Sequence, residues 1–142
     1  MREILFRGKR IDNGEWVYGT YLHQTLFYGD PVDDHWIIEH GEFDIDFYDA
    51  YRVISETVGQ YTNLTDKNGT KIFEGDIITT KKFGTPDRKY VVTYDEEIAT
   101  FIGETRLGCV NHFTTFQGDS EEFEVVGNIH DNPDLLKGGI KQ

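Results

Sequence analysis

The chain has 142 residues with a formal net charge of −12, and 37% of them are hydrophobic, 14% are aromatic and one is cysteine. This composition excludes a disordered chain and suffices for one domain, or for one core with an appended subdomain. It also excludes an intramolecular disulfide, and no apolar run approaches the ~20 residues of a membrane span. The start, "MREILFRGKR", lacks the apolar stretch of a secretory signal. We therefore expect a cytoplasmic protein without membrane contact.

The first third of the chain predicts antiparallel strands. "REILFRGKR" and "EWVYGTYL" flank Asp12-Asn13-Gly14. An Asn-Gly pair is typical of a two-residue type I′ hairpin turn, in which both central residues have positive φ. "HWIIE" and "EFDIDFY" follow, and the second alternates apolar and acidic residues as a half-buried strand does.

The stretch "TDKNGTKIFEGDII", Thr65 to Ile78, has some features of a ligand-binding loop. Its oxygen-bearing side chains match the first positions of a calcium loop, but Lys71 replaces the required glycine and Ile77 the bidentate glutamate. A phosphate loop needs more glycines and a following helix. The stretch instead predicts a hairpin turn at Asn68-Gly69 and a break or bulge at Gly75-Asp76, which would bend the strand as in a small barrel.

The second half of the chain continues as strands and ends in a short helix. "YVVTY" and "IATFI" are joined by Asp95-Glu96-Glu97, which predicts another hairpin, and "EFEVVGNI" alternates with its glutamates outward. In "DNPDLLKGG", Asn132 can cap a helix that begins at Pro133 and ends before Gly138.

The charge is distributed unevenly. The chain has no Lys or Arg from Ile11 to Tyr51, directly after a basic start. This acidic stretch is either a solvated face or a recognition surface for a basic partner or for the N-terminus of a second copy. The residues predicted for such a surface are Asp33, Asp34, Trp36, Asp44, Asp46 and Asp49. Candidate aromatic anchors, which could equally lie in the core, are Trp16, Tyr21, Tyr28, Trp36 and Tyr48.

No catalytic, cofactor or metal site is predicted. Cys109 and His112 are three residues apart, so on a strand their side chains point to opposite faces. His35, Glu39 and His40, with the neighbouring Asp33 and Asp34, have the chemistry of metal ligands. Their spacing does not match a helical histidine pair or a cysteine pair, and His40 falls on the opposite face of a strand from His35.

Three segments resemble the YopX family of phage and prophage proteins: "ILFRGKRIDNGEWVYG", "ETVGQYTNLTDKNGTKIFEGDII" and "EVVGNIHDNPDLL". Ser55 and Asn63 depart from the family pattern, where proline and glycine are common. The resemblance implies a phage-encoded, mostly β protein and gives no catalytic residue to carry over. The residues predicted to form structural motifs, most of them from this resemblance, are Gly59, Asp66, Asn68, Gly69, Gly75, Asp76, Gly127, Asn128 and Pro133.

The sequence therefore predicts a mostly β protein. N-terminal hairpins (residues 1–60) would pack on a small SH3-like barrel with a short C-terminal helix (residues 61–142). The predicted function is a non-catalytic protein-interaction module of a phage or prophage, with a host or phage protein, or a second copy of the chain, as partner. One alternative is an acidic nucleic-acid mimic. The other is nucleic-acid binding through the basic loop 81–89, which the net negative charge disfavours.

Overall fold

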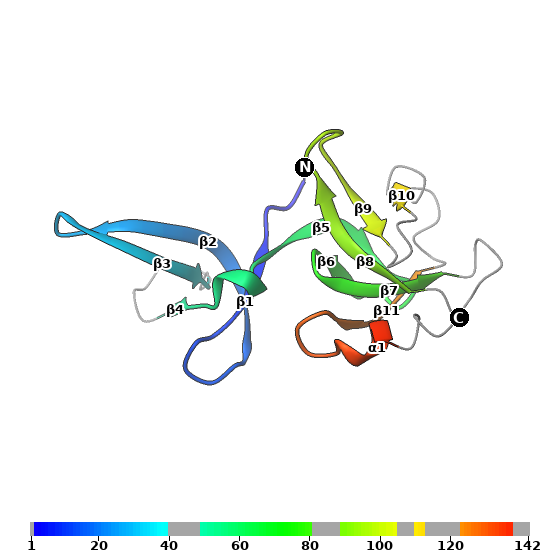
Figure 1. Ribbon diagram of the computed structural model, residues 1–142, viewed down its shortest axis with the longest axis horizontal. Coiled ribbons are helices and arrows are strands. Elements are labelled where there is room, and N and C mark those ends of the chain that lie inside the picture. Colours follow the sequence, from blue (N-terminus) through cyan, green and yellow to red (C-terminus); the bar gives the residue numbers. More distant parts are fainter. Residues whose placement is uncertain (1, 40–48, 81–88, 105–109, 113–122, 138–142) are drawn as a thin grey trace. The chain divides into compact units, whose positions relative to one another are not determined.

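The computed structural model describes residues 2–39, 49–80, 89–104, 110–112 and 123–137. The chain forms two compact units, Met1–Tyr61 and Thr62–Gln142. Its strands are β1 (Phe6–Lys9), β2 (Trp16–Phe27), β3 (Asp30–Ile38), β4 (Ala50–Arg52), β5 (Gly59–Thr65), β6 (Lys71–Phe73), β7 (Asp76–Thr80), β8 (Lys89–Asp95), β9 (Thr100–Glu104), β10 (Val110–His112) and β11 (Phe123–Asn128). The helical segments are the 3-10 helix η2 (Ser55–Thr57) and α1 (Asp134–Lys137) (Figure 1). The predicted mostly β fold is confirmed.

The described strands form two antiparallel sheets, of order β4-β3-β2-β1-β5-β6 and β10-β9-β8-β7-β11. The first unit contains the hairpin β1–β2, as the sequence predicts, and a second hairpin, β2–β3. Its core is small, with Val17, Ile37 and Val53 buried at the centre. Phe6 and Tyr21 pack against this cluster from β1 and β2.

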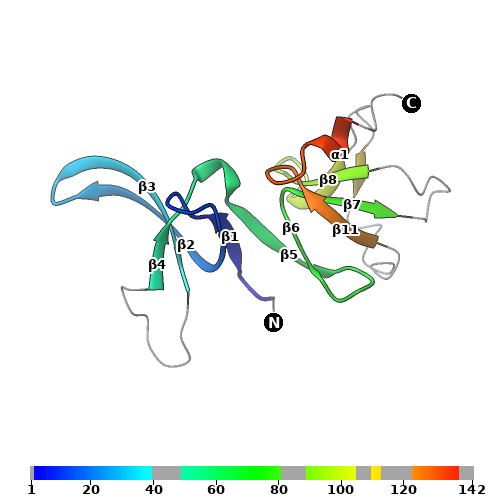
Figure 2. The same ribbon diagram turned by 90° about the horizontal axis from the view of Figure 1, so that it is seen from below.

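The second unit buries Ile72, Ile78, Tyr90, Val92 and Phe123. β7 lies between β8 and β11, and the views in Figures 1 and 2 show these strands side by side, with α1 following β11. Among the described residues the second sheet is open, because β10 and β11 stand at its opposite edges without pairing. The predicted SH3-like closure is therefore not seen in the part of the chain that the structure describes.

The Asn-Gly turns differ from the type I′ prediction. At Asn13-Gly14 and Asn68-Gly69 the glycine alone has positive φ, +72° and +81°. Gly69 N donates to Asp66 O and Asp66 N donates to Thr70 O, the pattern of a type I turn followed by a left-handed residue. The prediction was wrong in loop length, because the side-chain oxygen of Asp66 holds a longer loop by accepting from Asn68 N and Thr70 N.

Glu74 and Gly75 form a tight turn between β6 and β7, and Asp76 begins β7. Gly75 has a φ of +89°, which favours glycine, and the buried Asp76 accepts a hydrogen bond from Phe73 N at 2.7 Å. Gly75 N also donates to Val92 O, so the turn is fixed on β8. The predicted break of the strand at Gly75-Asp76 is present, and the stretch Thr65–Ile78 folds as a hairpin followed by a corner.

The other predicted motif residues lie in β5, β11 and the connection to α1. Gly59 is buried opposite Arg7, and Gly127 lies against Asn132 and Leu135. Asn128 Oδ1 accepts from His130 N and Asp131 N, which forms the turn before α1.

The helix boundaries differ from the prediction. The helix begins at Asp134, one residue after Pro133, and Asn132 Oδ1 accepts from Asn128 N rather than from the helix.

Several predictions fall on residues outside the described ranges. They are the strand "EFDIDFY", nearly all of loop 81–89, Cys109, Glu122 and Gly138. The hairpin around Asp95-Glu96-Glu97 is present, but its second strand begins at Thr100 rather than Ile98. The reason is a longer loop, in which Ala99 adopts a left-handed φ of +52°.

Candidate functional site on the β2–β3 hairpin

The β2–β3 hairpin extends beyond the rest of its sheet. Pairing of β2 with β1 ends at Gly19, and pairing of β3 with β4 ends at Trp36. Residues 22–35 beyond these points are called here the hairpin arm. Among the described residues, β2 and β3 have no third strand beside them along the arm (Figure 1). Only its base is tied to the rest of the unit, where Val53 N donates to His35 O. None of the arm's residues is buried, so this part of the hairpin has no core of its own.

The end of the arm carries large apolar side chains. Leu26, Phe27 and Tyr28, called here the apolar tip, are 62%, 56% and 93% exposed. The rings of Phe27 and Tyr28 meet edge to face with centroids 4.6 Å apart. Tyr28 and Gly29 both have positive φ, +49° and +85°, so this is a type I′ turn that the sequence analysis did not predict.

A β-bulge in the arm sets the register of its inner half. The pairing shifts between Gln24↔Asp34 and Leu26↔Pro31, so two residues of β3 oppose Thr25 of β2. This shift places His23 directly opposite His35. Asp33 lies two residues before His35 and therefore on the same face.

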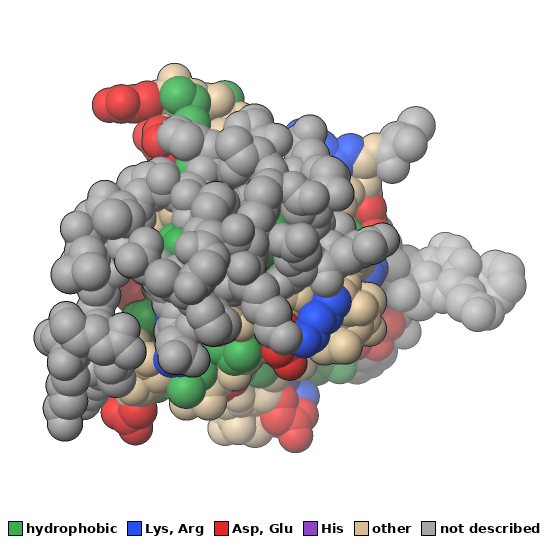
Figure 3. Space-filling view, turned by 90° about the vertical axis from the view of Figure 1, so that its right-hand side faces the viewer, with side chains coloured by type: hydrophobic (Ala, Val, Ile, Leu, Met, Phe, Trp, Pro, Cys, Tyr) green, Lys and Arg blue, Asp and Glu red, His purple; other side chains and the backbone are tan. Residues whose placement is uncertain are grey.

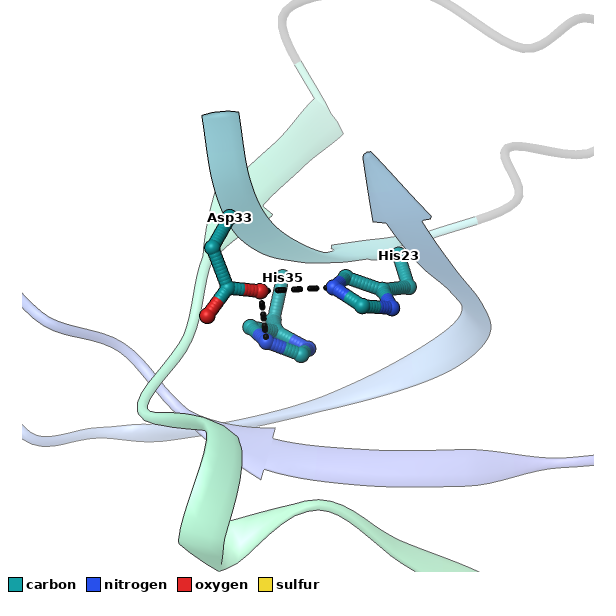
Figure 4. Close-up of side chains that lie close together, drawn as sticks. All are labelled: His23, Asp33 and His35. Atoms are coloured by element: carbon teal, nitrogen blue, oxygen red, sulfur yellow. Dashed lines mark hydrogen bonds and ion pairs between the residues drawn. The ribbon is translucent and has the colours of Figure 1, made fainter. Parts of the chain in front are cut away.

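His23, Asp33 and His35 form one group of side chains, called here the His–Asp cluster (Figure 4). The Nε2 atoms of His23 and His35 lie 2.6 and 3.1 Å from the same oxygen, Asp33 Oδ1. The two imidazole rings are stacked, with centroids 4.2 Å apart and an angle of 9° between their planes. The hydrogen bond with His23, together with the electrostatic effect of the nearby His35, holds the pKa of Asp33 below its ordinary value.

Tyr21 joins this cluster to the core. Its hydroxyl lies 2.5 Å from His35 Nδ1, and its ring is nearly parallel to that of His35. The same ring contacts Phe6 with centroids 5.6 Å apart. Burial, with a contribution from the charge of Asp33, raises the pKa of the Tyr21 hydroxyl. His35 is thus held from one side, whereas His23 and Asp33 are exposed.

The opposite face of the arm carries different contacts. Asp34 Oδ1 accepts from Arg52 at 2.8 Å, and Trp36 Nε1 donates to Gln24 Oε1 at 3.0 Å. Of the residues predicted for an acidic surface, Asp33 and Asp34 therefore lie on opposite faces, and each has a partner. Figure 3 shows another face of the molecule, on which the visible acidic side chains stand at separate points. Asp49 is partly buried, and Asp44, Asp46 and Tyr48 are outside the described residues.

Two members of the cluster were predicted from the sequence as ligand types, and the third was not. Asp33 and His35 were recognised as ligand types, but they were grouped with Glu39 and His40 along the chain. His40 lies outside the described residues, as does Cys109, and of His112 the structure gives the backbone alone. His23 comes from the neighbouring strand, β2. It lies opposite His35 only because the bulge shifts the register of the two strands.

Comparison with known proteins gives a family and a fold. The sequence model of the family described as "YopX protein" matches residues 5–137. Among solved structures, protein EF1440 from Enterococcus faecalis is similar, with a TM-score of 0.54 and 21% identity over 96% of this chain and 99% of that chain. No curated protein matches the sequence. In the described part of the chain, no helix has both the length and the apolar character needed to cross a membrane.

Proposed function

This chain belongs to the YopX family, and we propose that it acts as a non-catalytic protein-binding module whose apolar tip enters a pocket on its partner. In the bacterial host cell, such a module would act by contact with a host or phage protein. The observation that carries the proposal is the exposure of Leu26, Phe27 and Tyr28 at the end of an arm without a core.

The position of these side chains supports a binding role. Single exposed apolar residues are common, but a contiguous exposed apolar group is typical of interaction sites. Tyrosine is among the residues that contribute most to binding energy in interfaces. The type I′ turn matches the twist of the two strands, so the tip is presented by a regular turn rather than by an irregular loop.

The charge around the tip favours one kind of partner. Asp30 follows the turn and is exposed, Asp33 lies further along the same strand, and the sequence has no Lys or Arg between Ile11 and Tyr51. A matching pocket would be apolar at its centre with Lys or Arg at its rim, because opposite charges steer association and fix its orientation. Capture of the partner should then weaken as salt is raised.

The test compares three forms of the full chain as bait in host lysate, with quantitative mass spectrometry of the bound proteins. The tip variant is Phe27→Thr with Tyr28→Asn, which keeps the turn because Asn-Gly is favoured in type I′. The control is Ile98→Thr, which removes an exposed apolar side chain from the β8–β9 hairpin. Loss of one interface anchor costs about 2 kcal/mol, or roughly thirtyfold in affinity.

We expect a protein that binds the parent and the control and is recovered at least tenfold less with the tip variant. The same difference must persist when that protein is purified and titrated against the three forms. Equal binding of the parent and the tip variant would contradict the proposal. If a DNA-binding protein is retained by all three forms in a salt-dependent way, nucleic-acid mimicry becomes the better account and the apolar tip is not the binding site.

A further inference from the structure

We propose that His23, Asp33 and His35 form a binding site for a divalent transition-metal ion of the zinc class, with solvent completing the coordination. Imidazole nitrogen and carboxylate oxygen are the ligands that suit such ions. The three ligand atoms lie within 4.8 Å of one another on one face of the hairpin arm. The proposal does not depend on the partner of the apolar tip.

The distances in the cluster are close to those of a metal site. In a tetrahedral zinc site with bonds of about 2.0–2.1 Å, neighbouring ligand atoms are roughly 3.3 Å apart. His35 Nε2 is already 3.1 Å from Asp33 Oδ1, whereas His23 Nε2 is 2.6 Å from it and must move outward. The rings must also leave their parallel stack, since each nitrogen lone pair lies in the plane of its ring.

The exposed members of the cluster can make this adjustment. The side chains of His23 and Asp33 are 44% and 79% exposed, so they can rotate in solvent without disturbing the core. His35 is 15% exposed and provides the fixed ligand. A strand register that places the histidines opposite each other lets one ion bridge β2 and β3 where the arm has no core to hold the strands together.

Tyr21 provides the outer contact that histidine ligands usually have. A metal-binding histidine normally donates its second ring nitrogen to an acceptor, which fixes the tautomer and the orientation of the ring. Tyr21 Oη lies 2.5 Å from His35 Nδ1 and can accept from it once Nε2 is free to bind the ion. Tyr21 is therefore a positioning residue rather than a ligand.

The test titrates ZnCl2 into the full-length chain by isothermal calorimetry, after treatment with a chelator. His23→Gln, His35→Gln and Asp33→Asn remove one ligand each, and Asp34→Asn is the matched control. Asp34 is the adjacent acid on the opposite face of β3, where it pairs with Arg52. Tyr21→Phe tests the positioning role.

We expect one ion per chain, at least a tenfold loss of affinity in each ligand variant, and unchanged affinity in Asp34→Asn. Tyr21→Phe should weaken binding by about 10–100-fold, as loss of an outer contact does. Ring nitrogen signals of His23 and His35, followed by NMR, should shift on addition of zinc in the parent and in Asp34→Asn. Absence of saturable binding, equal binding by Asp33→Asn and Asp34→Asn, or one ion per two chains would each overturn the proposal.

Discussion

Asp66 gives the most direct test of how the second unit is held together. Its side chain is 6% exposed and accepts three backbone hydrogen bonds, each 2.9 Å long. Two come from Asn68 and Thr70 in its own turn, and the third comes from Val125, which lies 59 residues away on β11. In the same region Lys67 N donates to Phe123 O. Asp66 therefore fixes the β5–β6 hairpin to β11.

The cost of removing this side chain follows from the surroundings of the three donors. Asn68 and Thr70 are exposed, so water can replace the carboxylate there at about 0.5–1 kcal/mol each. Val125 is partly buried, and the loss of its charged acceptor should cost about 1.5–3 kcal/mol. We therefore expect Asp66→Ala to lower the free energy of unfolding by about 3 kcal/mol. Asp66→Asn should cost about 2 kcal/mol, because one amide oxygen can serve only part of the three donors.

Urea unfolding followed by circular dichroism would measure these losses. Asp95→Asn is the matched control, because Asp95 caps the β8–β9 turn through one local bond, from Glu97 N. It should cost less than about 1 kcal/mol. The two tryptophans, Trp16 and Trp36, both lie in the first unit, so their fluorescence reports separately on that unit. If Asp66→Asn were no more destabilising than Asp95→Asn, the long-range bond to Val125 would not have the importance given to it.

The pH dependence of Asp66 has a definite sign. Burial alone would raise its pKa, but hydrogen bonds from Val125, Thr70 and Asn68 outweigh this effect and lower it. The stabilisation is then complete above the unfolded pKa of about 3.9 and is lost as the pH falls through the lower folded value. The difference in stability between the parent and Asp66→Asn should therefore be constant near neutral pH and shrink below about pH 4. A difference that grows on acidification would contradict this assignment.

Two glycines give further predictions. Gly69→Val should lower the free energy of unfolding by about 1 kcal/mol or more, because φ is +81° in open space and the cost is purely conformational. Gly69→Asn, which tolerates the left-handed region, should recover much of the loss in the same urea experiment. Gly19→Ala should cost about 3 kcal/mol, since a Cβ there would collide with the backbone carbonyl of Ile38. Tryptophan fluorescence would detect this change, and a loss below about 1 kcal/mol would show that β2 and β3 can separate easily.

The sequence predicted the strands more reliably than the turns. Apolar runs separated by short polar breaks identified the hairpins β1–β2 and β8–β9, because such breaks can be recognised from local composition. The Asn-Gly pairs were assigned to two-residue turns, whereas Asp66 holds a longer loop through its side-chain oxygen. The two-residue turn occurs at Tyr28-Gly29. There Tyr28 has a left-handed backbone conformation that residues other than glycine rarely adopt. The predicted closure of the second sheet is not seen among the described residues, because closure depends on pairing between distant strands, which local patterns do not determine.

The His–Asp cluster was beyond the reach of pattern analysis for a related reason. A regular hairpin around Tyr28-Gly29 would place His23 opposite Asp34. The bulge near Thr25 shifts the register by one residue, and His23 faces His35 instead. A shift of one residue moves side chains to the other face of a sheet, and the sequence carries no clear signal for this bulge. Residue types that can bind a metal are recognisable in the sequence, but whether their side chains lie together depends on the register of β2 and β3.

The residues proposed for binding lie apart from those that hold the two cores, and mutations should separate the two roles. The first unit depends on a few buried side chains around Val17, Ile37 and Val53, and the second depends on contacts such as those of Asp66. Residues 22–35 add no fully buried side chain to either core. Substitutions at Tyr28 or Asp33 should therefore alter partner or metal binding while leaving the free energy of unfolding nearly unchanged. Substitutions at Gly19 or Asp66 should lower the free energy of unfolding while leaving the proposed binding residues in place. Large apolar side chains kept in water at the end of an arm without a buried residue are what the proposed binding role would account for.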